Sequence, residues 1–397
     1  DFDRLGLLEL CCVGPFPLWR RSLHEEIGYF DERFKSAADY EFWLRAALAH
    51  DFIHVPEFLG LYWLSPETVS RKGELPTLEY LLVQKEYRPR YAPLTPTPVA
   101  LSPEEQEAFQ RLLIRLEGGD PAAPGAVEDF LKRHPRAAQP HHELALLLHR
   151  RGDIGLAKTH FEKAVLLDPA SERYREGLRA FQAKELSEPL AYYLEQAGAA
   201  PENLEHQLCA GAILTLLGRF EEARTYYLRA KAIAPETPLA AGNLAFLEGS
   251  GAPGRTELAA KAPSRCSPEA ASEGVLVSAI VSTYNSERFI RGCLEDLEAQ
   301  TIAHRMEIIV VDSASPQNEG AIVAEFQKRY DNIRYIRTAE RETLYAAWNR
   351  GVEAARGAFL TNANTDDRHR ADALEVMAAA LEATPEVDLV YGDCYVS

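Results

Sequence analysis

The sequence of 397 residues contains no apolar run that approaches the roughly 18 residues of a membrane-spanning helix. It also has no excess of basic residues: the formal net charge is −17, which argues against a nucleic-acid partner. The six cysteines include no C-x-x-C pair, so neither a zinc site nor a disulfide framework is expected. N-x-S/T acceptors and a signal peptide are missing as well. These absences favour a reduced, cytoplasmic setting, with peripheral attachment to the inner membrane as an open alternative.

What the chain does contain is an ordinary globular composition, 46% hydrophobic and 26% charged. Its length predicts two or three domains. Because the sequence begins at Asp1 and not at a methionine, we expect it to be a fragment of a longer protein.

Residues 275–397 alternate apolar bursts with amphipathic stretches. Strands are expected over 275–283, 307–312, 333–337, 358–362 and 387–395, and helices over 287–300, 320–330, 343–356 and 371–383. Strands that alternate with helices of about 12 residues predict an α/β fold with a mostly parallel sheet. Ligands of such sheets bind beyond the carboxyl ends of the strands, so the chemistry is expected there.

Residues 121–250 are rich in alanine and leucine and repeat internally. Residues 138–169 and 204–235 resemble tetratricopeptide repeats in the spacing of their small residues, aromatic residues and closing prolines. The two closing prolines are 66 positions apart, close to twice the roughly 34-residue period. We therefore predict an all-α repeat domain that presents a groove to a partner. A degenerate middle repeat is expected in the interval, with Gly177, Tyr193 and Pro201 at suitable positions.

The remaining residues form two linkers and a third zone. Residues 88–120 combine a proline-rich linker with a connecting helix, and residues 251–274 are a linker of small residues. The third zone, residues 1–87, is expected to hold strands over 5–13 and 52–64 and a helix over 37–50.

Three motifs of the last zone follow one another in a recognisable order. Residues 277–285 read VSAIVSTYN, residues 307–315 read EIIVVDSAS, and residues 346–369 read AAWNRGVEAARGAFLTNANTDDRH. Together they resemble the donor-binding half of a family 2 glycosyltransferase with the GT-A fold. The resemblance covers residues 275–397 and implies a Rossmann-like sheet.

The resemblance implies that five residues bind the donor. Thr283 and Tyr284 would border the nucleotide base, and Asp312 would accept a hydrogen bond from the base or the ribose. Asn349 and Arg350 would line the pocket near the diphosphate. Without the resemblance, Asp312 at a strand end is equally well explained as the cap of a turn.

The segment Asn364-Thr365-Asp366-Asp367 stands in the place of the family's D-x-D metal motif. Mn²⁺ or Mg²⁺ held there would neutralise the charge of a diphosphate leaving group. Asn364 offers only a neutral carbonyl oxygen, so it is assigned to donor binding, and the metal is expected to rest mainly on Asp366 with Asp367 assisting. Taken alone, the segment is explained as a surface turn in which Asp367 caps the next helix.

The N-terminal zone reads VGPFPLWRRSLHEEIGYFDERF followed by SAADYEFWLRAAL, and resembles the acceptor half of the same family. The residue that matches the family's catalytic base is Asp39, which would take the proton of the acceptor hydroxyl. Glu41 is the competing candidate, and without the family Asp39 is an acid in the first turn of a helix. Trp19 and Arg20 are either acceptor-side or packing residues.

The two halves occur in the reverse of the family's order, with the repeats between them. Two explanations are open: a cut from a tandem glycosyltransferase–repeat–glycosyltransferase protein, or a permuted enzyme. Because residues 1–87 and 275–397 are complementary parts of one template, we expect them to dock into one composite domain. Asp39 and Asp366 should then face each other across a cleft.

The sequence thus predicts an inverting glycosyltransferase of bacterial polysaccharide biosynthesis. It would move a sugar from a nucleotide-diphosphate donor to a glycan or protein acceptor, and the repeats would recruit that acceptor or a protein partner. One alternative is a repeat scaffold whose incomplete catalytic halves are inactive. The other is a nucleotidyltransferase on a similar sheet, which would release pyrophosphate.

Overall fold

The computed structural model describes residues 2–63, 73–95, 97–236, 238–249 and 274–396. The chain divides into two compact units: the first comprises residues 1–7, 11–83 and 227–397, and the second comprises residues 8–10 and 84–226. Among the described residues, no helix combines the length and the apolar character needed to cross a membrane. The linker predicted at 251–274 lies outside the described residues, apart from Gly274.

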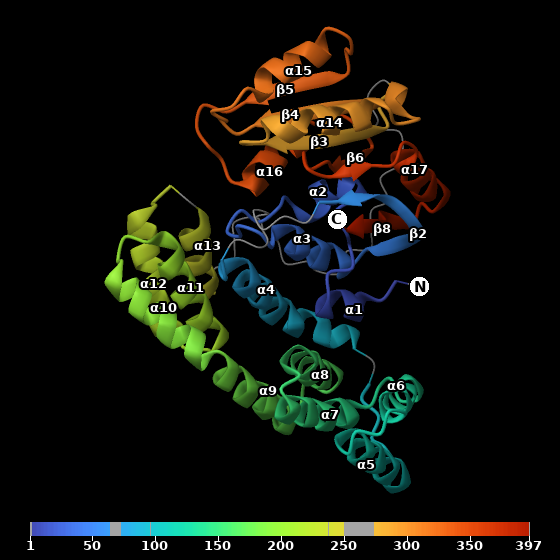
Figure 1. The fold of residues 1–397 in the computed structure, drawn as a ribbon, viewed down its shortest axis with the longest axis vertical. Coiled ribbons are helices and arrows are strands. Elements are labelled where there is room, and N and C mark those ends of the chain that lie inside the picture. The colour runs from blue at the N-terminus through green and yellow to red at the C-terminus, as the bar shows by residue number, and fades with distance from the viewer. Residues whose placement is uncertain (1, 64–72, 96, 237, 250–273, 397) are drawn as a thin grey trace. The chain divides into compact units, whose positions relative to one another are not determined.

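An eight-stranded sheet with the order β5-β4-β3-β6-β1-β8-β2-β7 organises the first unit (Figure 1). The strands are β1 (Pro17–Arg20), β2 (Asp51–Tyr62), β3 (Val277–Thr283), β4 (Met306–Asp312), β5 (Ile333–Arg337), β6 (Phe359–Asn362), β7 (Arg368–His369) and β8 (Val387–Val396). The strands predicted within 275–397 and over 52–64 are confirmed.

The sheet is mixed, and the prediction of a mostly parallel sheet is wrong for its second half. β3 pairs in parallel with β4 and β6, β4 with β5, and β2 with β8. β1 runs antiparallel to both β6 and β8, and β7 runs antiparallel to β2. β1 lies between strands that are more than 300 positions away in the sequence, so no βαβ crossover sets its direction.

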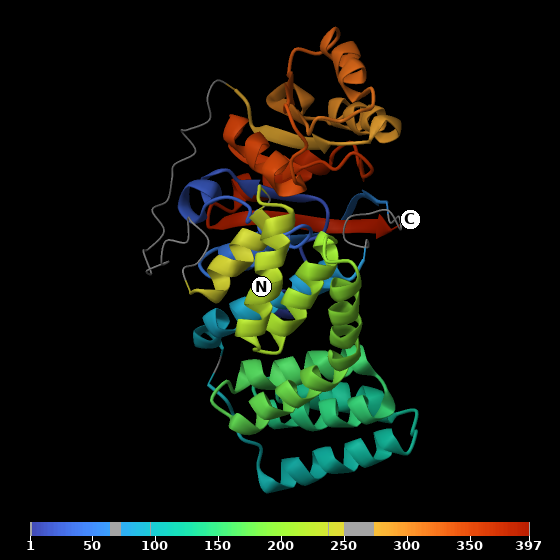
Figure 2. The same cartoon turned by 90° about the vertical axis from the view of Figure 1, so that its left-hand side faces the viewer.

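β1 and β2 join two distant parts of the sequence. Trp19 of β1 lies opposite Leu360 of β6 and Leu389 of β8, and β2 follows β8 over its whole length. Figure 2 shows the red β8 beside the blue N-terminal strands. Residues 1–87 and 275–397 thus contribute strands to one sheet, as the expected docking requires. That they are the acceptor and donor halves of one enzyme stays a prediction.

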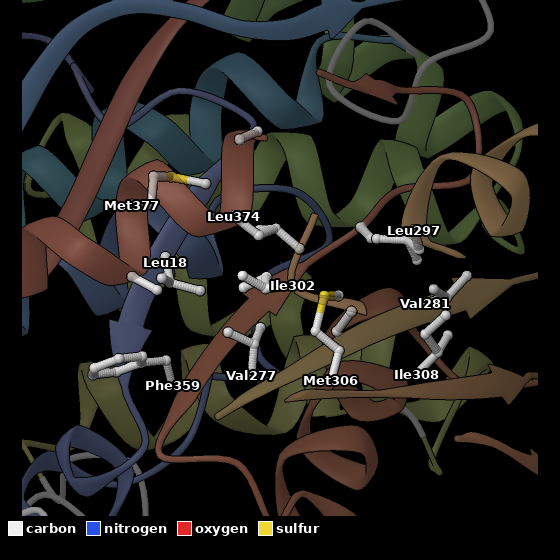
Figure 3. Close-up of a cluster of buried hydrophobic side chains, with 14 of the residues drawn as sticks. Leu18, Val277, Val281, Leu297, Ile302, Met306, Ile308, Phe359, Leu374 and Met377 are labelled. Carbon is white, nitrogen blue, oxygen red and sulfur yellow. The ribbon is translucent and has the colours of Figure 1, made fainter. Parts of the chain in front are cut away.

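One face of the sheet carries α14 (Glu287–Glu298), α15 (Glu319–Gln327) and α17 (Ala373–Ala383). Their apolar side chains enclose a buried core with alternate residues of the strands, such as Val281, Met306 and Ile308 (Figure 3). Every second residue of a strand points to the same face, so the apolar runs of β3 and β4 supply side chains to both faces.

The opposite face is covered by α16 (Leu344–Ala354) and α3 (Ala38–Ala47). A Cβ atom at Gly351 of α16 would stand 2.4 Å from Ile280 Cγ2, so glycine is what permits this close approach. Aromatic rings from both parts of the sequence pack together beneath the two helices: Trp19, Phe30, Phe42, Trp43, Tyr345 and Trp348. The first unit therefore has the helix–sheet–helix layering of an α/β fold.

Two predictions for the N-terminal part are wrong. The strand predicted over 5–13 is instead α1 (Arg4–Glu9), because Asp3 accepts a hydrogen bond from the Gly6 amide at 2.9 Å and caps the first turn. The linker predicted from residue 88 begins inside helix α4 (Leu75–Tyr91), which contains a proline. Tyr87 and Tyr91 lie one turn apart and are fully buried, and their packing holds the last turn despite the missing proline amide.

The second unit is helical. Its helices are α5 (Pro103–Glu117), α6 (Ala123–Arg133), α7 (Ala138–Arg151), α8 (Ile154–Leu167), α9 (Glu172–Glu185), α10 (Ser187–Ala199), α11 (Leu204–Leu216) and α12 (Phe220–Ile233), whose last residues are assigned with α13 (Pro238–Leu247) to the first unit. α7 and α8 pack as a pair. The helical prediction for this region and the connecting helix before it are confirmed.

The middle repeat is not the helix pair that was expected. Leu186 alone separates α9 from α10, and Figure 1 shows one running directly into the other. Helical hydrogen bonds continue through the junction, from Leu186 N to Gln182 O at 2.9 Å and from Leu190 N to Leu186 O at 3.0 Å. Residues 178–188 contain no glycine or proline, so nothing in the backbone forces a turn there.

Candidate functional site

Three parallel strands end at one edge of the sheet in polar residues. Thr283 at the end of β3 is paired with Asp312 at the end of β4, and Asn362 ends β6. All three are buried, and within the described residues Thr283 Oγ1 and Asn362 Oδ1 have no hydrogen-bond partner. Ligands of α/β sheets bind beyond the carboxyl ends of the strands, so this edge is the candidate site.

Asp312 is fully buried and bonded to protein groups on both oxygens. The Arg337 guanidinium and the Tyr335 hydroxyl donate to Oδ2, and the Ser315 amide donates to Oδ1 at 2.7 Å. Arg337 also donates to the Ser315 carbonyl oxygen at 2.7 Å. Asp312 therefore organises the ends of β4 and β5, and its contact with a base or ribose stays a prediction.

The turns after β3 and β4 are tied together. Asn285 and Ala314 have φ values of 54° and 53°, in the left-handed region that residues other than glycine seldom adopt. The Asn285 amide donates to Ser315 Oγ at 3.0 Å, which links one turn to the other. Beside them, the Arg341 guanidinium lies 4.1 Å from the centre of the Tyr284 ring. Strained backbone of this kind concentrates at functional sites.

The segment from Asn364 to Asp367 forms a turn between β6 and β7. Asn364 Nδ2 donates to Asp367 Oδ2 at 3.0 Å, and the Trp63 amide donates to Asp367 Oδ1 at 3.2 Å. Asp367 is 1% exposed, and burial raises its pKa to about 7. Asp366 is half-buried, burial raises its pKa, and among the described residues only its own amide donates a hydrogen bond to its side chain. Asp366 is thus the carboxylate that remains open to a ligand.

Asp39 lies in the first turn of α3 and is partly exposed. Its Oδ1 accepts hydrogen bonds from the Tyr40 amide at 2.8 Å and from the Tyr345 hydroxyl at 3.1 Å. Burial raises the pKa of the Asp39 carboxyl, and these two hydrogen bonds, together with one from the residue's own amide, oppose the rise. Tyr345 belongs to α16, so the sheet unit brings the predicted base against the helix that carries Asn349 and Arg350.

The two predicted donor residues of α16 have different surroundings. Asn349 accepts a hydrogen bond from the Phe30 amide at 2.9 Å and donates to the Phe30 carbonyl oxygen at 3.0 Å and to Glu32 Oε1 at 2.9 Å. Arg350 is exposed and forms an ion pair with Glu342. Asn349 therefore joins the two parts of the sequence, and the role of both residues in donor binding stays a prediction.

The competing base candidate is enclosed. Glu41 is 1% exposed and accepts a hydrogen bond from Arg45 Nη2 at 2.8 Å. Arg45 also donates to the carbonyl oxygens of Ile27, the last residue of α2 (Ser22–Ile27), and of Tyr29 at 2.7 Å. The Glu41 carboxylate therefore serves a buried ion pair.

Trp19 and Arg20 have packing contacts. Trp19 is fully buried and donates from Nε1 to His24 Nε2 at 3.1 Å. Arg20 donates to the carbonyl oxygens of Leu381 at 2.7 Å and Val387 at 2.9 Å, where α17 ends and β8 begins. Of the two roles left open by the sequence, the structure supports packing.

Two side chains that hold α3 and Asp39 in place were not predicted from the sequence. Glu79 of α4 accepts hydrogen bonds from the amides of Lys35 and Ser36, both at 2.8 Å, and so holds the loop that leads into α3. Burial raises the pKa of Glu79 to about 7. Tyr345 lies four positions before Asn349, which places both on one face of the predicted helix. That spacing was the available signal for Tyr345, whereas no motif marks Glu79.

The comparisons with known proteins match two regions of the chain. Residues 278–397 match the family model described as Glycosyl transferase family 2, and residues 138–171 and 210–237 match the Tetratricopeptide repeat model. The segment of α9 and α10 falls between the two repeat matches, in keeping with its unbroken helix.

The chain is similar to several named proteins over part of its length. EpsH of Bacillus subtilis is 39% identical over 29% of this chain and 32% of its own length. Glycosyltransferase AglE of Haloferax volcanii is 33% identical over 30% of this chain and 38% of its own length. A crystal structure of S. aureus TarS with UDP is 25% identical over 28% of this chain and 32% of that chain, with a TM-score of 0.26.

The chain covers well under half the length of the curated relatives that it matches. The matched strands nevertheless include β3, β4 and β6, whose ends form the candidate site. The C-terminal part of this chain is a glycosyltransferase family 2 domain, and its middle contains tetratricopeptide repeats.

Proposed function

We propose that this chain is an inverting glycosyltransferase that moves a sugar from a nucleotide-diphosphate sugar to a glycan or protein acceptor. The observation that carries the proposal is the Tyr345–Asp39 contact within one sheet unit. It brings a partly exposed carboxylate from residues 1–87 against the helix that follows the donor-side strands. A base and a donor site are thus supplied by one unit.

Asp39 is proposed to act as the general base. Its carboxylate accepts the proton of the acceptor hydroxyl while that oxygen bonds to the anomeric carbon, and the bond from the anomeric carbon to the diphosphate oxygen breaks. Attack from the side opposite the leaving group inverts the configuration. Asp39 suits this role better than Glu41, because Glu41 is buried in its ion pair with Arg45.

Donor binding is assigned to the ends of β3 and β4. The unpartnered Thr283 Oγ1 and the exposed surface around Tyr284 and Arg341 support a site for the base, next to Asp312. Arg350 is the cation of α16 that is available to a diphosphate, because its ion pair with Glu342 is exposed and easily exchanged.

The turn from Asn364 to Asp367 fits a divalent cation that has few protein ligands. Asp366 supplies an open carboxylate, and Asp367 shapes the turn, since Asn364 and Trp63 donate to its two oxygens. Across the described part of the chain, no group of three or more His, Cys, Asp or Glu side chains forms a cage, so diphosphate oxygens and water would complete the coordination. When bound, Mn²⁺ or Mg²⁺ would neutralise charge on the leaving diphosphate.

The repeats are proposed to recruit the acceptor or a protein partner. Ile114 of α5 is 67% exposed and Leu146 of α7 is 37% exposed. They line a hollow of about 220 Å³ together with Gln110, Leu113, Glu117, Glu143, Leu147 and Arg150. The same hollow is the observation that favours the second candidate, a repeat scaffold without turnover.

Hydrolysis of nucleotide sugars by the purified chain, with and without Mn²⁺, tests the function. The proposal expects release of a nucleoside diphosphate, and Asp39→Asn should slow it about 10²–10⁴-fold with donor affinity unchanged. Release of pyrophosphate would identify a nucleotidyltransferase, and no release from any donor would identify the scaffold. A near-normal rate in Asp39→Asn would move the base to another residue. If recruitment is correct, deleting residues 121–250 should reduce transfer to the native acceptor more than donor hydrolysis.

A further inference from the structure

The Asp39 carboxylate is held by a side chain that is 306 positions away in the sequence. The Tyr345 hydroxyl donates to Asp39 Oδ1 at 3.1 Å, and the Tyr40 amide donates to the same oxygen at 2.8 Å. Apart from the residue's own amide, no other group of the described residues donates to this carboxylate. Tyr345 and Tyr40 thus hold the same oxygen, Oδ1.

Packing fixes the direction of the Tyr345 hydroxyl. Tyr345 is 1% exposed, its ring meets Trp348 edge-on with centroids 5.2 Å apart, and the Phe30 ring lies 6.2 Å away. Phe30 is fixed in turn by its two hydrogen bonds to Asn349, one turn further along α16. The phenol therefore has little freedom to rotate away from Asp39.

The pKa of Tyr345 decides which of the two groups donates the hydrogen bond. Burial raises the pKa of Tyr345 well above its ordinary value of 10, so the phenol keeps its proton at neutral pH. The Tyr345 O–H is then the donor and Asp39 Oδ1 is the acceptor. A hydrogen bond to the ionised form favours that form.

We propose that Tyr345 is a positioning residue, which holds one oxygen of Asp39 and so aims the other oxygen at the acceptor hydroxyl. The inference rests on the proposed function, in which Asp39 is the base. It also ties the base to the donor side of the site, because Tyr345 and the candidate donor residue Arg350 belong to the same helix.

Other titratable groups surround Asp39 without bonding to it. Cys11 and the α4 residue Tyr80 interact electrostatically with Asp39. The Tyr80 hydroxyl accepts a hydrogen bond from the Cys11 amide at 2.6 Å. Burial raises the pKa of both groups, so they are uncharged at neutral pH. Glu79 acts electrostatically on Tyr345. Of the described side chains, Tyr345 alone donates a hydrogen bond to Asp39.

The test is a pH titration of Asp39 in the full chain. The ¹³C signal of its carboxyl carbon is followed by NMR and assigned by its absence in Asp39→Asn. Tyr345→Phe keeps the ring and removes the hydroxyl, so it should raise the pKa of Asp39 and reduce its ionised fraction at acidic pH about tenfold. Tyr80→Phe removes a neighbouring hydroxyl that bonds to backbone, and should leave the Asp39 titration unchanged.

Donor hydrolysis by the same proteins separates the inference from the proposed function. Tyr345→Phe should move the acidic limb of kcat/KM to higher pH while donor affinity stays constant. If the Asp39 titration is unchanged in Tyr345→Phe, the inference is overturned even when the parent protein turns over a donor. If that titration shifts but no donor is hydrolysed by the parent protein, the failure belongs to the proposed function. If Tyr345→Phe does not fold, fluorotyrosine at position 345 replaces it in the test. Fluorotyrosine keeps the hydroxyl and is a stronger hydrogen-bond donor, so it should lower the pKa of Asp39. An unchanged pKa of Asp39 would overturn the inference.

Discussion

Asn349 of α16 exchanges two hydrogen bonds with the backbone of Phe30, 319 positions away: 2.9 Å from the Phe30 amide to Oδ1 and 3.0 Å from Nδ2 to the Phe30 carbonyl oxygen. A third, to Glu32 Oε1, is 2.9 Å long. Tyr345 lies one turn earlier on the same helix and contacts Asp39. α16 is therefore the element that connects the N-terminal residues to the donor-side strands.

Asn349→Ala should destabilise the first unit. It leaves the buried amide and carbonyl of Phe30 without partners, which costs about 1–3 kcal/mol of unfolding free energy. Chemical unfolding followed by tryptophan fluorescence measures the change, because Trp19, Trp43 and Trp348 lie in the affected cluster. The neighbouring variant Arg350→Ala is the control, since it removes an exposed ion pair and should cost no more than about 1 kcal/mol. Equal effects of the two variants would contradict this role of Asn349.

Asp366→Ala should abolish the Mn²⁺-dependent part of nucleoside diphosphate binding. Asp366 is the carboxylate of the turn to which no other described residue donates, and a hard cation needs such an oxygen. Calorimetric titrations with and without Mn²⁺ provide the measurement. Asp367→Asn is the matched variant and should retain more of the metal dependence, because Asp367 serves the turn. The assignment fails if Mn²⁺ strengthens binding to Asp366→Ala as much as to the parent protein.

The stability of the first unit should fall as pH rises towards neutrality. Burial raises the pKa of Glu79 from 4.5 to about 7, so the folded state binds this proton more tightly than the unfolded state. The stability that the proton contributes is fully present below pH 4.5 and is lost as pH rises through about 7, by at most about 3 kcal/mol. Glu79→Gln cannot titrate and should flatten this part of the pH profile, whereas the exposed Glu74→Gln should not. An unchanged slope in Glu79→Gln would contradict the prediction.

Two glycines of the first repeat should respond in opposite directions to alanine. Gly152 ends α7 with φ of 82°, and Gly155 lies in the first turn of α8; an added Cβ meets nothing within 4 Å at either position. Gly152→Ala should therefore lose about 1 kcal/mol through backbone strain alone. Gly155→Ala should gain up to about 1 kcal/mol from helix propensity. Thermal unfolding of the second unit measures both, and a loss in Gly155→Ala would show that its surface is in contact with something else.

Much of the first unit was predictable from the sequence, because its elements are marked locally. β3 and β4 are almost entirely buried and mostly apolar, and the helices between the strands have the spacing of one apolar face. α1 was missed because its start depends on one capping contact, from Gly6 to Asp3. The middle repeat was mispredicted because the sequence keeps the spacing of the repeats, whereas the helix continues where a repeat would have its turn.

The candidate site likewise has residues that the sequence predicted and contacts that it did not. The order of the motifs and their place after strands were sufficient to select Asp312 and the segment from Asn364 to Asp367, because a residue that follows a strand is a local property. The resemblance also pointed to Asp39, but nothing near it in the sequence indicates its partner. Glu79 has its role because α4 packs against the loop that leads into α3. Tyr345 and Asn349 have theirs because α16 and residues 1–87 belong to one sheet unit. A hydrogen bond between residues hundreds of positions apart depends on how every intervening element packs, so the tertiary structure alone decided those contacts.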